Sequence, residues 1–143
     1  MDLFDLANIC EKQEKVIKKA ANEAAISLAI DLITALIKAT PVDTSRALSS
    51  WLAGINAVND EEIKHGIYQG KHGSTAEASR NAAIAKATAI IKGKRAGDSI
   101  IISNNAPYIR RLNSGWSPQA SPLFIERQIT LVNAKLKAGD YYK

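Results

Sequence analysis

The sequence contains almost no cysteine or histidine, and this scarcity limits the chemistry that the chain can carry out. Among 143 residues there is one cysteine, Cys10, and there are two histidines, His65 and His72. A lone cysteine cannot form an intramolecular disulfide, so the chain can mature in a reducing cytoplasm. A zinc site needs several His, Cys or carboxylate ligands at closing distances. We interpret both histidines as surface residues, and we expect no metal site and no cofactor.

The sequence also has no long uninterrupted hydrophobic run. The apolar stretch 20–37 is broken by Asn22, Glu23 and Asp31, which would be costly at the centre of a membrane. Residues 1–5 are acidic, where a secretory signal would be basic. These features predict a soluble protein that does not enter a membrane.

The charge that is present is divided unevenly along the chain. Residues 1–62 hold six Lys and Arg against ten Asp and Glu, a net charge of −4, whereas residues 63–143 hold thirteen against four, a net charge of +9. Such asymmetry is typical of a nucleic-acid surface, or of a subunit whose two complementary faces meet in an assembly. A solvated basic surface without a partner is the plainer alternative.

Length and composition predict one α+β domain over residues 1–143. We expect a long N-terminal helix and a C-terminal helix packed on a small, mainly antiparallel sheet, together with an alanine-rich central helix. The predicted order is a helix over 1–39, a turn and strand over 40–60, a loop and the central helix over 61–97, and a strand, turn and C-terminal helix over 98–139.

Local signals place the predicted strands and the start of the last helix. Alternation and bulk predict a strand over 51–58 with a bulge at Gly54. The β-branched run 99–103 predicts a second strand. Ser121 as N-cap and Pro122 at the first helical position predict where the last helix begins.

The first helix carries a second apolar stripe, on nearly the opposite side from its main one. The stripe consists of Ile26, Ile30, Ile33 and Ile37. A small domain rarely covers both sides of a terminal helix. The stripe therefore predicts either an interface with a second copy or burial under later elements of the same chain, and the sequence leaves both readings open.

Two basic clusters are candidate phosphate contacts. The first contains Lys92, Lys94 and Arg95, and the second contains Arg110 and Arg111. Lysine and arginine can bind phosphates without reading base sequence. No helix-turn-helix or RNA-binding aromatic motif accompanies them, so the clusters indicate nonspecific nucleic-acid binding as an alternative function.

No catalytic arrangement stands out. The loop 66–71 is a poor match to a phosphate-binding loop, since its glycines are one residue too close. The triplet 43–45 has the Asp-Thr-Ser pattern of an aspartic protease, but a helix and Pro41 precede it in place of an apolar strand. A small hydrolase using Asp43 or Cys10 is the last-ranked hypothesis, and we expect no enzymatic activity.

Two segments, taken together, resemble the neck or tail-completion proteins of tailed bacteriophages. The first, residues 40–51, is a Thr-Pro-Val-Asp-Thr turn followed by Arg, Leu and Ser-Trp. The second, residues 103–115, is a strand end, an Asn-x-x-Pro-Tyr turn and a helical turn ending in glycine. The residues that carry the resemblance are Pro41, Asp43, Thr44, Arg46, Trp51, Asn104, Pro107, Tyr108 and Gly115. Ser45 departs from the family pattern, which has glycine there.

The resemblance extends over about residues 15–60 and 97–137, and it implies a structural virion protein without catalysis. Such a subunit would form a ring with copies of itself at the head–tail junction or the top of the tail. Its other partners would be connector or tail proteins, and DNA could pass through the ring without sequence-specific contact. The chain would be made in the host cytoplasm and end in the virion.

Overall fold

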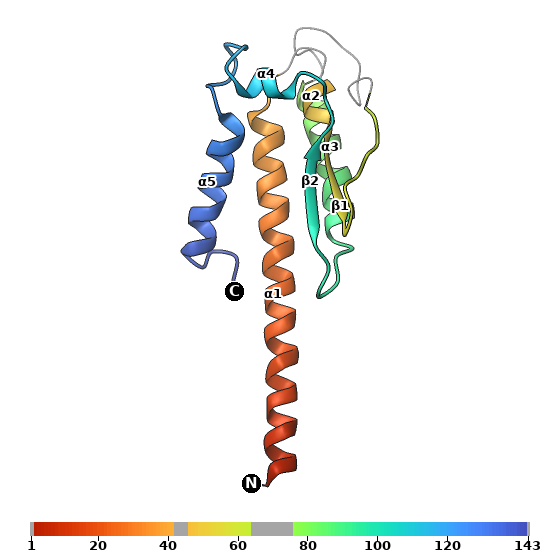
Figure 1. Ribbon diagram of the computed structural model, residues 1–143, viewed down its shortest axis with the longest axis vertical. Helices are drawn as coiled ribbons and strands as arrows, with labels where there is room; N and C mark the ends of the chain where they lie inside the picture. Colours follow the sequence, from red (N-terminus) through yellow and green to blue (C-terminus); the bar gives the residue numbers. More distant parts are fainter. Residues whose placement is uncertain (1, 42–45, 64–75, 143) are drawn as a thin grey trace.

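The computed structural model describes residues 2–41, 46–63 and 76–142. The elements in this part of the chain are α1 (Leu3–Ala39), α2 (Arg46–Ser49), β1 (Trp51–Ile55), α3 (Ala76–Ile91), β2 (Ile100–Asn104), α4 (Ile109–Asn113) and α5 (Phe124–Lys137). Long first and last helices combined with a small antiparallel sheet confirm the predicted α+β class (Figure 1).

Helix α1 has strong signals at both ends. At its start the Asp2 side chain accepts from the Asp5 backbone N–H at 2.9 Å, while the Asp5 carboxylate accepts from the Asp2 N–H at 3.2 Å. This reciprocal capping satisfies donors that a helix N-terminus leaves free. At its end Thr40 turns into an extended conformation directly before Pro41. Between these ends the helix is continuous.

The sheet has two strands in the described residues, β1 and β2, paired antiparallel from Trp51 opposite Asn104 to Ile55 opposite Ile100. The register is unbroken, so the bulge expected at Gly54 is wrong. Glycine is needed there for another reason, because a Cβ at Gly54 would lie 2.1 Å from the Ala57 carbonyl oxygen. The strand also ends before the predicted Val58, since Asn56 takes a φ of 61° and turns the chain.

We call the described residues from 22 to 142 the body, and the second half of α1 lies at its centre (Figure 1). Helix α5 packs mainly against one side of α1, while α3 packs against α1 and β1 on the other. The buried core forms where α1, α2, α3 and β1 meet. Its fully buried or nearly fully buried members include Ile33, Leu36, Ile37, Leu48, Leu52 and Ile91.

Helix α5 begins later than the sequence predicts. Its first residue is Phe124, and Leu123 precedes it with a φ of 60°, so Ser121 and Pro122 lie outside the helix. The cap comes from α4, because the Asn113 Oδ1 accepts from the Ile125 N–H at 3.0 Å. A side chain distant in sequence thus supplies what a local N-cap would normally provide.

The first half of α1 leaves the body. Every residue from Asp2 to Ala21 is exposed, and we call residues 2–21 the arm. Figure 1 shows the arm continuing beyond the ends of α5 and the sheet as a single helix. Helix α1 is long and apolar enough to cross a membrane, but the core helices of soluble proteins meet the same criterion of length and composition. Its second half forms the core described above.

Candidate functional site

The two segments that carry the resemblance meet in one corner of the body. Trp51 at the start of β1 lies opposite Asn104 at the end of β2. The Asn104 amide donates to the Ala47 carbonyl at 2.9 Å, and its Oδ1 accepts from the Ala106 N–H at 2.9 Å. One side chain therefore bonds both segments and fixes the turn that follows β2. We call this region the corner.

A buried pair of hydrogen bonds ties the end of α1 into the corner. The Trp51 indole N–H donates to the Thr40 hydroxyl oxygen at 2.8 Å, and that hydroxyl donates to the Leu36 carbonyl at 2.6 Å. Thr40 and Trp51 are both buried. Pairing matters here because a buried donor without a partner costs about 1–3 kcal/mol.

Arg46 and Tyr108 add a further link between the segments. The Arg46 guanidinium lies 5.9 Å from the centre of the Tyr108 ring, and its Nε donates to the Ile63 carbonyl at 3.0 Å. A cation held over an aromatic face is attracted by the ring.

The remaining residues of the two motifs are placed as follows. Pro107, between Asn104 and Tyr108, is exposed. Asp43 and Thr44 lie outside the described residues.

The chain beyond α4 forms an exposed edge next to the corner. Gly115 has a φ of 96°, and a Cβ there would lie 2.8 Å from the Pro122 side chain, so glycine is required on both counts. Trp116 is 71% exposed and Leu123 is 57% exposed. The Arg111 guanidinium lies over the Trp116 ring, 4.9 Å from its centre. Two large apolar side chains thus face solvent at one end of the body.

The isoleucine stripe of α1 lies in the chain's own core. Ile33 and Ile37 are 0% exposed, and Ile26 and Ile30 are partly buried against the same cluster. An interface with a second copy at Ile33 and Ile37 is therefore wrong. Helix α3 and the corner cover this side of α1. Of the two alternatives that the sequence left open, the structure therefore shows burial under later elements of the same chain.

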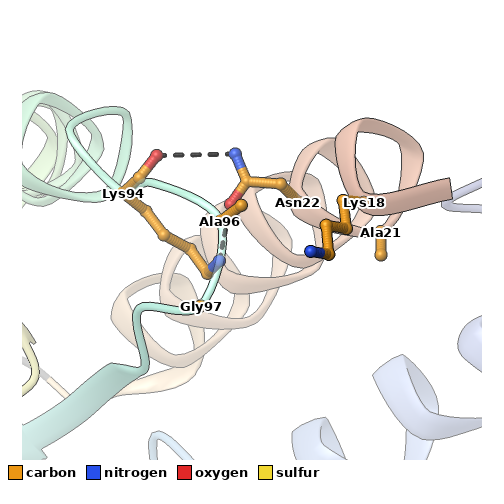
Figure 2. Close-up of a pocket in the computed structure, with 6 residues that line it drawn as sticks. All are labelled: Lys18, Ala21, Asn22, Lys94, Ala96 and Gly97. Atoms are coloured by element: carbon orange, nitrogen blue, oxygen red, sulfur yellow. Dashed lines mark hydrogen bonds between the residues drawn. The ribbon is translucent and has the colours of Figure 1, made fainter. Parts of the chain in front are cut away.

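The first basic cluster is partly used inside the molecule. The Lys94 ammonium donates to the Asn22 Oδ1 at 2.6 Å (Figure 2). It also donates to the Arg95 carbonyl at 3.1 Å. Asn22 and Lys94 line a shallow hollow of about 310 Å³ between α1 and the turn. Lys92 and Arg95 are exposed, but Asp98 lies in the same turn and accepts from the Arg95 N–H.

The two basic clusters lie at opposite ends of β2. Residues 92–95 precede this strand and Arg110 and Arg111 follow it, and Figure 1 shows the turn before β2 far from α4. Five strand residues span about 17 Å. Arg111 is also stacked on Trp116. The residues proposed for phosphate contact therefore form two clusters separated by the length of β2.

One titratable group joins α1 to the end of the chain. Asp31 accepts a hydrogen bond from the Tyr141 hydroxyl and lies 3.2 Å from the Lys135 ammonium. The Tyr141 hydrogen bond, aided by Lys135, lowers the pKa of Asp31 below its ordinary value, although burial acts the other way. Burial, with the Asp31 carboxylate, raises the pKa of Tyr141. The arrangement docks the residues after α5 onto α1.

The residues with nucleophilic or metal-binding chemistry do not form a site in the described part of the chain. Cys10 is exposed on the arm. No three His, Cys, Asp or Glu residues among those described are placed to hold a metal ion. His65, His72, the loop 66–71 and the triplet 43–45 lie outside the described residues.

The sequence singled out most residues of the corner but missed Asn113 and the pairing of Asn22 with Lys94. Asparagine in a helical turn is compatible with many roles, and no local pattern links it to a helix eleven residues later. The one local signal there was Gly115, which predicted the end of a helical turn.

No family model, curated protein or solved structure matches the chain.

Proposed function

We propose that this chain is a structural subunit of a tailed bacteriophage particle, at the head–tail junction or the top of the tail. Copies of it assemble into a ring and contact neighbouring connector or tail proteins, without catalysis. The chain is made in the host cytoplasm and ends in the virion.

The observation that carries the proposal is the corner. Residues 40–51 and 103–115 resemble two separate motifs of the phage neck and tail-completion proteins. The two segments interact through the Asn104 amide bonded to the Ala47 carbonyl, through Arg46 over Tyr108, and through backbone pairing of the start of β1 with the end of β2. If the resemblance were accidental, nothing would require its two parts to form one structural unit.

The exposed edge next to the corner supports a contact between copies. Trp116 and Leu123 are large apolar side chains left in solvent, and aromatic residues are enriched in protein interfaces. A ring requires a heterologous contact, in which one face meets a different face of the next copy. We assign the Trp116 and Leu123 edge to one side of that contact.

Negative-stain imaging and native mass measurement of the purified protein test the proposal. We expect closed rings of one copy number in the wild-type protein. The Trp116→Ser/Leu123→Asn variant should stay folded without forming rings, because asparagine tolerates the left-handed conformation of residue 123. Asn133→Ser, an exposed change on α5, is the matched control and should form rings.

A wild-type protein that remains monomeric at high concentration would contradict the ring. Rings that persist in the Trp116→Ser/Leu123→Asn variant would contradict the assignment of the ring contact to Trp116 and Leu123, but would not contradict ring formation.

A further inference from the structure

The arm is an amphipathic helix without a partner in the described chain. Most of its apolar side chains share one face, with the charged residues largely on the other, where the exposed Phe4 also lies. They recur at alternating spacings of three and four residues, with Gln13 as the polar member of the series: Leu3, Leu6, Cys10, Gln13, Ile17 and Ala20. Ile9 and Val16 widen the same face. This spacing is the pattern by which two helices pack along a common seam.

Local interactions stabilise the arm as a helix but leave this face uncovered. The Asp2 and Asp5 cap closes its start, and Glu11–Lys15 and Glu14–Lys18 form ion pairs at 3.5 Å and 2.6 Å. The apolar side chains remain in solvent, with Leu3 83% and Ile17 65% exposed. Exposed ion pairs of this kind add little to the stability of a helix, and they leave its apolar face open to solvent.

We propose that the arm of one copy pairs with the arm of a second copy, with the two helices antiparallel. The contact has two-fold symmetry, so it is separate from the heterologous ring contact and does not depend on it. It joins copies of the chain two by two.

Charge favours the antiparallel orientation. The tip of the arm carries Asp2 and Asp5 and no basic residue, whereas the part nearer the body carries Lys12 and Lys19 in addition to its two ion pairs. An antiparallel pair places the acidic tip of each helix beside the basic part of the other. A parallel pair would place like charges together, which opposes association.

The free length of the arm fits one register. With Leu6 opposite Ile17 of the second copy, Leu3 lies opposite Ala20 and Cys10 lies opposite Gln13. The tip then reaches the point where the body begins, since Asn22 already contacts Lys94. The exposed helix from residue 3 to residue 21 is about 28 Å long, so nearly all of it is used.

Engineered cysteines test both the pairing and its direction. In a Cys10→Ser background, a Leu6→Cys protein is mixed with an Ile17→Cys protein and oxidised gently. We expect the mixed disulfide to predominate at least tenfold over either homodisulfide, because residues 6 and 17 face each other. Two Leu6→Cys copies would have their cysteines about 16 Å apart in this register, too far for a disulfide.

An Asn8→Cys protein in the same background is the matched control, because Asn8 lies on the polar face of the arm. When it is mixed with the Ile17→Cys protein, it should form no more mixed disulfide than random collision produces. Predominant Leu6→Cys homodisulfides would show a parallel pair and overturn the proposed orientation. Cross-linking no greater than for Asn8→Cys would overturn the pairing altogether.

Sedimentation provides a measurement without cysteines. Ile17→Glu should weaken association of the arms at least tenfold, whereas Asn8→Glu should leave it unchanged. Neither residue contacts the body, so both variants should retain its circular dichroism spectrum and thermal unfolding. Equal association of the two variants would contradict the proposal.

Discussion

The Thr40 hydroxyl accepts from the Trp51 indole and donates to the Leu36 carbonyl, so one side chain closes a helix and positions the next strand. Asn104 and Asn113 act in a similar way, each bonding to backbone far away in the sequence. Small polar side chains thus hold the corner and the start of α5 in place. Their roles depend on partners that sequence spacing does not reveal.

Asp31 gives the chain a predictable dependence on pH. Its pKa in the folded protein lies below the ordinary value of 3.8, so the carboxylate contributes stability above about pH 4. That contribution is lost as the pH falls through the lowered pKa of the folded state. Because the side chain is 35% exposed, we expect Asp31→Asn to cost about 0.5–1 kcal/mol near neutral pH.

Urea unfolding of wild-type protein and Asp31→Asn checks this expectation. The two proteins should differ near neutral pH, and the difference in free energy of unfolding should shrink as the pH falls below 4 and the wild-type carboxyl becomes neutral. Asp140→Asn, an exposed change in the same terminal segment, should have little effect at either pH. A difference between wild type and Asp31→Asn that persisted in acid would contradict the electrostatic explanation.

At the scale of elements, α5 depends on α4 for its first turn. The Asn113 side chain accepts from the Ile125 N–H and donates to the Glu126 carboxylate at 2.8 Å. Local capping is replaced by a contact between two elements, because Leu123 cannot accept a hydrogen bond through its side chain. The start of α5 is therefore linked to the position of α4.

Asn113→Ala should destabilise the protein by about 1 kcal/mol, the usual cost of removing an N-cap. Amide hydrogen exchange should accelerate at Ile125 and in the first turn of α5, while the core of α1 remains protected. Asn133→Ala, on the exposed side of the same helix, should be close to neutral. Equal exchange in the two variants would show that the cap does not hold the helix.

At the scale of the whole molecule, the chain divides into a body with a core and an arm without one. The core lies where the second half of α1 meets α2, α3 and β1, and the arm contributes nothing to it. This division separates folding from assembly. A subunit of this shape can change its contacts along the arm without changing the stability of its body.

Removal of residues 1–19 should therefore leave the body folded. At a protein concentration low enough to prevent association, the free energy of unfolding should change by less than about 0.5 kcal/mol. Thermal unfolding followed by circular dichroism measures this, with a lower helical signal as the expected side effect. Loss of cooperative unfolding would show that the arm supports the body.

The local pattern of the sequence was sufficient to predict α1, a central helix within residues 61–97 and the α+β class. Apolar periodicity, helix caps and β-branched residues act over a few positions, so these features follow from neighbouring residues alone. The corner was predicted only as two separate motifs. The sequence did not show that Arg46 would meet Tyr108, since that contact arises from strand pairing.

Burial of the isoleucine stripe and exposure of the arm were decided by tertiary structure. Both halves of α1 are helical with apolar faces, although residues 2–21 hold eight charged residues and residues 22–39 hold three. Which half becomes core depends on where α3, α5 and the sheet pack, and these elements reach only to about Asn22. The sequence by itself determined that α1 is a helix with apolar faces, whereas packing determined which of those faces remain available to another molecule.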